Sequence, residues 1–252
     1  MKNLLYILSF LFSFGLFAQN KVLFEQGNAL YNDGKYAEAI SKYESVLDTK
    51  NHSADLYFNL ANAHYKLNNI APSIFYYEKA LQLAPNDKEI QNNLAFAKNM
   101  TVDAIEVVPN VGFSKLFKNI THSMSFDAWA KTSVILVFVF VILFLMYYFA
   151  YSSGRKRLAF IGSTLSIILL CVALAFAFQK YALDKKDKPA IVFAQESKVK
   201  SEPNLRSEES FRLHEGTKVQ VIDSVDNWRK IKLSDGKMGW LASEDIKRLT
   251  AF

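Results

Sequence analysis

The sequence predicts a multidomain membrane protein with three unlike parts: an all-α repeat solenoid, a transmembrane helical hairpin and a small all-β domain. Three observations lead to this fold class. Residues 20–100 repeat with a period of 34 residues, two uncharged apolar runs follow, and short alternating segments begin near residue 190. Hydrophobic residues make up 51% of the 252 residues, and the apolar runs hold much of that excess. The composition therefore argues against a simple soluble enzyme.

The net charge of +6 does not indicate a nucleic-acid-binding surface, because the basic excess lies beside the apolar runs. The residues concerned are Lys2, Lys115, Lys118, Lys131, Arg155, Lys156, Arg157 and Lys180. This distribution is typical of membrane flanks. Cys171 is the single cysteine, which excludes an intrachain disulfide and any multi-cysteine metal site.

Residues 1–18 have the layout of a secretory signal peptide. Lys2 gives a positive start, Leu4–Phe17 is apolar, and the small residue Ala18 precedes Gln19. We expect cleavage after Ala18. The alternative is an uncleaved anchor helix, although the apolar run is short for a membrane span.

Residues 20–100 contain repeats in which small and aromatic residues recur 34 positions apart. Gly27 aligns with Ala61, and Tyr43 aligns with Tyr77. Pro85 ends a helix and Asn86-Asp87 begins the next one. These features resemble the tetratricopeptide repeat, which implies stacked helix pairs with a concave groove for protein segments.

The resemblance implies that the first helix of each repeat lines this peptide-binding groove. The implied residues are Phe24, Asn28, Tyr31, Asp55, Phe58, Asn62, Tyr65 and Lys66. An asparagine amide can donate to and accept from a peptide backbone. A packing role for the asparagines and tyrosines is an equally open interpretation.

Residues 101–131 are expected to form a linker that includes an interfacial amphipathic helix. Phe113, Leu116, Phe117 and Ile120 recur at helical spacing, opposite lysines on the other side. Ser125 is placed to cap the helix that follows.

Two transmembrane helices are predicted at 132–151 and 158–179. The loop between them, 152–157, carries Arg155-Lys156-Arg157 and is therefore expected on the cytoplasmic side. The parts before and after the hairpin would then both be exported. Neither apolar run contains an ionisable residue, which argues against a transporter acting alone.

Residues 190–250 alternate in short runs broken by turn residues. Asp235-Gly236 indicates a hairpin, and the pattern with Gly239-Trp240 resembles the bacterial SH3-like barrel. That resemblance implies binding of protein partners or cell-wall peptide. Trp228 is the candidate for an exposed ligand face, although it could equally be packed inside the domain.

The histidines His52, His64, His122 and His214 are scattered without ligand spacing, and no phosphate loop, nucleophile elbow or zinc motif is present. We therefore expect no enzymatic activity, no metal and no cofactor.

The order of the parts resembles BatE proteins of the bacterial aerotolerance operon. This resemblance implies a non-enzymatic scaffold in the bacterial inner membrane, with repeats and C-terminal domain on the periplasmic side. The implied partners are Bat proteins with von Willebrand type A domains and, indirectly, a MoxR-type ATPase. Two alternatives stay open: a cell-wall-binding anchor or sensor acting through the SH3-like domain, and an accessory subunit of a transporter.

Overall fold

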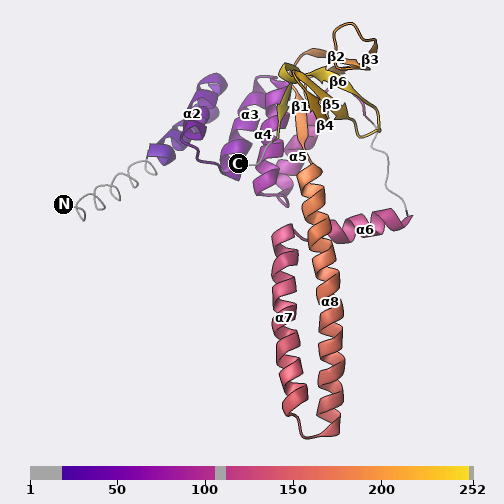
Figure 1. The fold of residues 1–252 in the computed structure, drawn as a ribbon. Coiled ribbons are helices and arrows are strands. Elements are labelled where there is room, and N and C mark those ends of the chain that lie inside the picture. Colours follow the sequence, from indigo (N-terminus) through magenta and orange to yellow (C-terminus); the bar gives the residue numbers. More distant parts are fainter. Residues whose placement is uncertain (1–18, 106–111, 250–252) are drawn as a thin grey trace, which may run out of the picture. The chain divides into compact units, whose positions relative to one another are not determined.

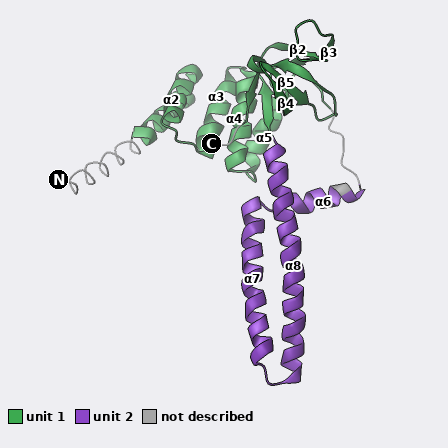
Figure 2. Ribbon diagram, viewed as in Figure 1, with its two compact units in different colours: residues 1–107, 188–252 green, residues 108–187 purple. Residues whose placement is uncertain are grey.

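The computed structural model describes residues 19–105 and 112–249 (Figure 1). The chain divides into two compact units, one formed by residues 1–107 and 188–252 and the other by residues 108–187 (Figure 2). The signal peptide expected at 1–18 lies outside the described residues.

The N-terminal part of the first unit is a stack of antiparallel helices. Residues 19–32 are helical, and four helices follow: α2 (Tyr36–Asp48), α3 (Ala54–Lys66), α4 (Ile70–Leu83) and α5 (Lys88–Lys98). The Asp87 side chain caps α5 by accepting hydrogen bonds from the backbone N–H groups of Glu89 and Ile90. This confirms the helix end at Pro85 and the helix start that follows it.

The repeat core explains why small residues recur in the sequence. A Cβ atom built on Gly27 would lie 2.5 Å from the Tyr43 ring, so no side chain fits between these helices. One period later, Ala61 is 0% exposed and Tyr77 is 1% exposed. The close helix crossings expected at Gly27 and Ala61 are therefore present.

The C-terminal part of the first unit is an antiparallel seven-stranded sheet with the order β3-β2-β6-β5-β4-β1-β7. The strands are β1 (Pro189–Val192), β2 (Glu196–Lys200), β3 (Glu209–His214), β4 (Lys218–Val225), β5 (Trp228–Lys232), β6 (Met238–Ala242) and β7 (Ile246–Arg248), with a short 3-10 helix, η1 (Ser243–Asp245), before β7. The expected hairpin joins β5 to β6, and Gly236 has the positive φ of 94° that such a turn requires. The described pairings leave β3 and β7 as edge strands. They agree with an SH3-like domain, whereas the closed barrel stays a prediction.

The sheet packs directly on α4, the second helix of the second repeat. Ile191 and Leu249 are buried in the same apolar cluster as Ile74 and Phe75. The Lys247 ammonium lies 4.8 Å from the centre of the Phe75 ring, a cation–π contact. Ile191 and Leu249 therefore belong to the core of the repeats, whereas other buried residues of the sheet form a core of their own.

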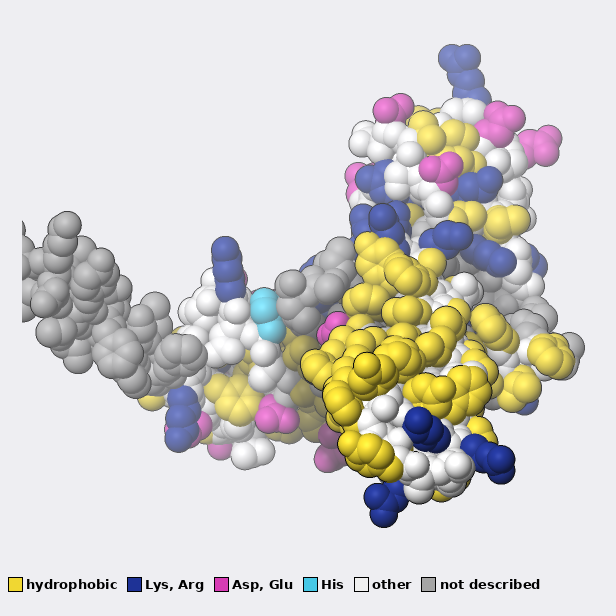
Figure 3. All heavy atoms as spheres, turned by 60° about the horizontal axis from the view of Figure 1, so that its bottom comes forward, with side chains coloured by type: hydrophobic (Ala, Val, Ile, Leu, Met, Phe, Trp, Pro, Cys, Tyr) yellow, Lys and Arg dark blue, Asp and Glu magenta, His cyan; other side chains and the backbone are white. Residues whose placement is uncertain are grey.

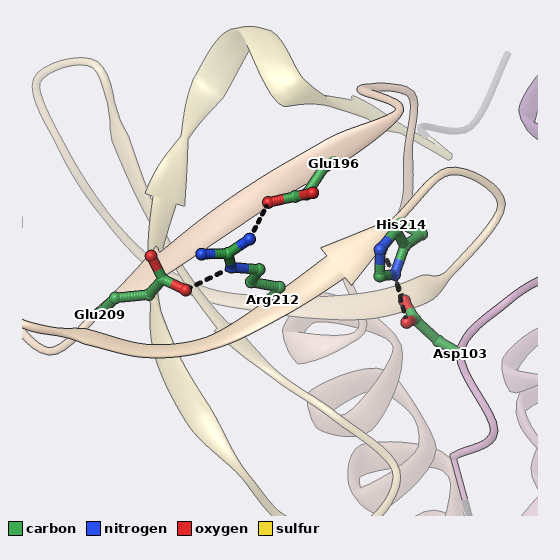
Figure 4. A network of polar contacts seen from close by, with 5 residues as sticks. All are labelled: Asp103, Glu196, Glu209, Arg212 and His214. Carbon is green, nitrogen blue, oxygen red and sulfur yellow. Dashed lines mark hydrogen bonds and ion pairs between the residues drawn. The ribbon is translucent and has the colours of Figure 1, made fainter.

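Polar contacts hold the same two parts together beside that core. The Asp103 carboxylate accepts hydrogen bonds from the His214 backbone N–H at 2.7 Å and the Thr217 hydroxyl at 2.6 Å, and His214 Nδ1 also lies 2.7 Å from it (Figure 4). Glu78 on α4 pairs with Lys218 at 2.7 Å and with Lys98 at 3.0 Å. Chain segments more than a hundred residues apart are thus joined by charged hydrogen bonds.

The second unit contains α6 (Gly112–His122), α7 (Phe126–Phe149) and α8 (Ser153–Lys186). As expected, Ser125 caps α7, its hydroxyl accepting from the Ala128 backbone N–H. The helices differ in extent from the predicted spans, since α7 begins six residues before 132 and α8 includes most of the predicted loop. The apolar run limits what can enter a bilayer, whereas the helix continues through flanking residues that also favour helical backbone.

Small residues allow α7 and α8 to lie close together. A Cβ on Gly162 would come within 3.0 Å of Leu143, and the Ser166 hydroxyl donates to the Leu136 backbone carbonyl at 2.8 Å. The outward surface of the pair is largely hydrophobic, with basic side chains at its loop end (Figure 3). Both helices are long and apolar enough to cross a membrane.

Candidate functional site: a groove on the repeats

The eight residues implied for the groove lie on two helices. Phe24, Asn28 and Tyr31 belong to the helix of residues 19–32, and the other five belong to α3. Spacings of three and four residues keep each set on one helix face. The structure divides this set between two hollows and a hydrogen-bond network that joins the helices.

Asn28 takes part in that network. Its Oδ1 accepts hydrogen bonds from the Tyr43 hydroxyl at 2.8 Å and from Asn59 Nδ2 at 2.9 Å. The amide therefore links the two helices of the first repeat to the first helix of the second. This is the packing role that was left open.

Asn62 makes the equivalent contacts one period later. Its Oδ1 accepts from the Tyr77 hydroxyl and, at 3.4 Å, from Asn93 Nδ2. Within the described part of the chain, the Nδ2 groups of Asn28 and Asn62 donate to no other residue. Each asparagine thus packs through its oxygen and keeps its N–H donors unused, which combines the two interpretations.

Both tyrosine hydroxyls of this network donate to an asparagine Oδ1. Burial raises the pKa of the Tyr43 hydroxyl to about 12 and raises the pKa of Tyr77 as well, with smaller contributions from neighbouring tyrosines. Both hydroxyls therefore keep the proton that they donate well above neutral pH.

A hollow of about 310 Å³ lies beside Asn62. It is lined by Tyr31, Asn62, Tyr65, Lys66, Tyr77, Glu89, Asn93 and Phe96. Four of these residues were expected in the groove. The lining combines aromatic rings, amide groups and one charge of each sign, which suits a peptide segment rather than a purely apolar ligand.

A second hollow has a volume of about 220 Å³, and two more of the expected residues, Phe24 and Asp55, line it. It is lined by Asn20, Lys21, Phe24, Val46, Asn51, Ser53, Asp55 and Leu56. Asn28 and Phe58 line neither hollow: Asn28 serves the network, and Phe58 packs against Tyr77 with ring centres 6.0 Å apart.

The α5 residues of the larger hollow, Glu89, Asn93 and Phe96, were missed by the sequence analysis. Glu89 and Phe96 stand 34 positions after Asp55 and Asn62, which were expected in the groove, so continuing the alignment into α5 would have placed both there. Asn93 aligns with Asn59, which was not expected in the groove, so the period does not indicate it.

The residues of α4 that contact the SH3-like sheet do not line the larger hollow. Contact with the sheet is made through Ile74, Phe75 and Glu78, although Tyr65 and Tyr77 of the hollow belong to the same apolar cluster.

His64, the histidine of α3, is a packing residue. It is buried and stacks on Tyr76 with ring centres 5.5 Å apart. Burial, helped by the charge of Lys247, lowers its pKa to about 4, so the ring is neutral at physiological pH. Among residues 19–105 and 112–249, no three histidine, cysteine or acidic side chains are grouped to hold a metal ion.

Trp228, the candidate for a ligand face, opens β5 and pairs with Val225 and Ala242 across the neighbouring strands. Its side chain is half-buried. Leu205 is far more exposed, at 84%, in the loop between β2 and β3. The structure thus offers two apolar side chains for a ligand face, and it buries neither against the repeats.

Family comparisons identify both folded parts of the first unit. Profiles of the TPR repeat and of the tetratricopeptide repeat match residues 27–68 and 54–87, and the bacterial SH3 domain profile matches residues 197–247. These matches confirm TPR repeats and a bacterial SH3 domain, and both modules support a protein-interaction or adaptor role. No curated protein matches the chain.

Two solved structures show local likeness. A crystal structure of an NlpC/P60 family protein from Bacillus cereus ATCC 10987 is 14% identical over 28% of this chain, with a TM-score of 0.22. This chain covers 23% of that protein's length. The first TPR of Spaghetti (RPAP3), bound to the HSP90 peptide SRMEEVD, is 24% identical over 32% of this chain and 92% of its own, with a TM-score of 0.23. At these TM-scores, neither likeness bears on function.

Proposed function

We propose that this protein is a membrane-anchored, non-enzymatic adaptor that binds segments of protein partners in the groove of its TPR repeats. The observation that carries the proposal is the larger hollow, where the N–H donors of Asn62 are unused beside Lys66, Tyr65 and Phe96. A groove of this composition has donors for backbone carbonyls and rings for apolar side chains.

Of the two charged residues that line the hollow, Lys66 suits an acidic residue of a partner segment and Glu89 suits a basic one. Lys66 is exposed and has no ion-pair partner among the described residues. An ammonium group so placed can take up a carboxylate without first breaking an existing pair. Asn62 would hold the backbone of the segment and Lys66 its acidic group.

The proposed anchor is the α7–α8 hairpin, with both ends on the same side of the membrane. Residues before and after the hairpin belong to one compact unit, and a chain that returns to its own starting unit must cross a bilayer an even number of times. Arg155, Lys156 and Arg157 at the loop favour the cytoplasm for that end. Repeats and SH3 domain would then lie in the periplasm of a bacterial inner membrane.

The arrangement of parts further supports the BatE-like assignment suggested by the sequence. On that assignment the partners are Bat proteins with von Willebrand type A domains, within an aerotolerance or envelope stress complex that involves a MoxR-type ATPase indirectly. TPR repeats, a hairpin and a bacterial SH3 domain in this order agree with it.

A second candidate function is cell-wall binding through the SH3 domain. The observation in its favour is the exposure of Leu205 in the β2–β3 loop, together with the half-buried Trp228. Sedimentation of the full chain with purified cell wall, with and without Trp228→Ala, tests this candidate separately.

The adaptor is tested by photo-crosslinking from the groove. A photoreactive phenylalanine at Phe96 in the full chain should crosslink to a defined set of membrane-associated partners in native cells. Lys66→Glu should lower the yield about tenfold or more, because loss of a charged hydrogen bond costs about 1.5–3 kcal/mol.

The matched control is Lys35→Glu, an equal charge reversal at an exposed lysine that lines neither hollow. It should leave the crosslinks unchanged. Equal yields from the Lys66→Glu and Lys35→Glu proteins would contradict the groove as binding site, and loss of partners only with Trp228→Ala would favour the SH3 domain.

A further inference from the structure

Helix α6 carries an apolar face that the second unit leaves largely uncovered. Phe113 is 87% exposed, Leu116 54%, Phe117 47% and Ile120 38%. These four side chains recur at spacings of three and four residues and so share one side of the helix, while Lys115 and Lys118 project from the other. Such a helix suits a surface in which an apolar layer borders a layer of charged groups.

Contacts with α7 and α8 fix the position of α6 along the length of the hairpin. The Phe117 ring lies 5.3 Å from the Phe176 ring of α8, and the Trp129 indole stacks on Phe176 at 5.1 Å. The Trp129 indole N–H also donates to the Thr121 backbone carbonyl at 3.3 Å, and Thr121 is fully buried. The C-terminal half of α6 is therefore fixed to both long helices.

The contacting residues on α7 and α8 lie at one end of the two apolar runs. Trp129 stands just before the uncharged run of α7, and Phe176 stands just before the end of the uncharged run of α8, which Lys180 follows. Tryptophan at such a position is typical of the membrane–water interface. Figure 1 shows α6 running crosswise to α7 and α8, which is the orientation of a helix that lies in the plane of an interface.

The charges of α6 favour binding to a negatively charged surface. The helix has two lysines and no acidic residue. We propose that α6 lies in the headgroup layer of a bilayer rich in anionic phospholipid, with its apolar face toward the acyl chains and Lys115 and Lys118 bound to lipid phosphates. This inference rests on the proposed insertion of the hairpin and adds a lipid-binding surface to it.

The occupant is a lipid surface rather than a protein because of this continuity. The apolar face of α6 adjoins the apolar outer surface of α7 and α8, so the medium that covers those helices also reaches α6. A lysine near an anionic membrane surface strengthens binding by a factor of about five. The two lysines together therefore favour anionic over neutral lipid.

The test uses the full chain in vesicles with an environment-sensitive fluorophore on one cysteine. In a Cys171→Ala background, Phe113→Cys places the label on the apolar face and Asn119→Cys places it on the side of the helix that carries Lys115. The unchanged chain, labelled at the exposed Cys171 of α8, reports whether the hairpin is inserted. Vesicles contain phosphatidylethanolamine with phosphatidylglycerol, or phosphatidylcholine alone, and quenchers are attached to lipid or dissolved in water.

We expect the label at 113 to be quenched by the lipid-bound quencher and the label at 119 by the aqueous one. Replacing both lysines, Lys115→Gln with Lys118→Gln, should abolish the extra lipid contact at 113 that phosphatidylglycerol produces. The charge-matched control, Lys35→Gln with Lys88→Gln at two exposed lysines of the repeats, should leave it unchanged.

Three results would overturn the inference while a lipid-quenched label at 171 still supports the hairpin. In the first, the aqueous quencher reaches the labels at 113 and 119 equally. In the second, the label at 113 is shielded from both quenchers, as a protein partner would shield it. In the third, lipid contact at 113 depends neither on the two lysines nor on anionic lipid. A label at 171 that the lipid-bound quencher does not reach would instead contradict the membrane insertion itself.

Discussion

The two sides of the second repeat differ in how fully their polar groups are used. On α4, Glu78 is held by two lysines, and in the segment after α5 Asp103 is hydrogen-bonded to the SH3 domain. On α3, Asn62 keeps its N–H donors unused, and Lys66 stands exposed beside a hollow. A satisfied surface stabilises the fold, whereas a surface with unused donors can exchange water for a ligand. The comparison explains why we place partner binding on α3 rather than on α4.

The largest effect is expected at Gly216, where the SH3 domain meets the repeats. Its φ is +85°, and an added Cβ would lie 2.8 Å from Thr101 and 2.9 Å from Ile70 and Ile74. Gly216→Ala should therefore combine backbone strain of about 1–2 kcal/mol with overpacking of about 1–3 kcal/mol. Thermal unfolding of the detergent-solubilised chain, followed by tryptophan fluorescence, measures the loss.

Gly236→Ala is the control for this prediction. Gly236 has a similar φ of +94° but open space around its Cβ position. It should show the backbone strain alone. Equal losses of stability in the two variants would mean that the SH3 domain does not pack on α4 in solution.

A smaller effect is expected from the partly buried carboxylate of Asp103. Burial works against its charge, but hydrogen bonds from Thr217 and His214 outweigh burial and hold its pKa below the usual 3.8. The folded state therefore gains stability from this group above about pH 4 and loses it as pH falls through the lowered pKa. Glu78 behaves in the same way, because its two lysines outweigh the burial that would raise its pKa.

Asp103→Asn should cost about 1.5–3 kcal/mol at neutral pH, the usual worth of a hydrogen bond to a charged group. It should also reduce the loss of stability as the pH falls below about 4. Urea unfolding at a series of pH values measures both effects. If the variant and the original chain lost the same stability on acidification, Asp103 would not be charged at this interface.

The repeats were largely predictable because their structure is local and periodic. The 34-residue alignment located the close contact at Gly27 and the helix boundary at Pro85, both of which depend on neighbours in the sequence. The same period would also have located Glu89 and Phe96 in the groove, had it been carried into α5, because they align with Asp55 and Asn62.

The interface between repeats and SH3 domain was not predictable in this way. Asp103 and His214 are 111 residues apart, and neither recurs at any period. Single charged residues in polar segments resemble ordinary surface residues until the fold brings them together. The role of Asn62 was equally undetermined, since an amide contains both donors and an acceptor, and only the position of the Tyr77 hydroxyl shows that the acceptor is used internally.

The smallest effect on stability, and the finest test of the groove, is expected from removing one hydroxyl. Tyr77→Phe should cost about 0.5–1.5 kcal/mol, the net worth of an ordinary hydrogen bond. It also leaves Asn62 Oδ1 with the weaker 3.4 Å contact to Asn93, so the Asn62 amide loses its fixed orientation beside the hollow. Crosslinking from Phe96 should therefore fall. Tyr43→Phe removes the same hydroxyl from the first repeat, where its partner Asn28 lines neither hollow. It should cost similar stability and leave crosslinking unchanged. If both variants reduced crosslinking equally, the hydrogen bonds accepted by Asn28 and Asn62 would support the fold alone. The unused donors of Asn62 would then have no part in holding a partner.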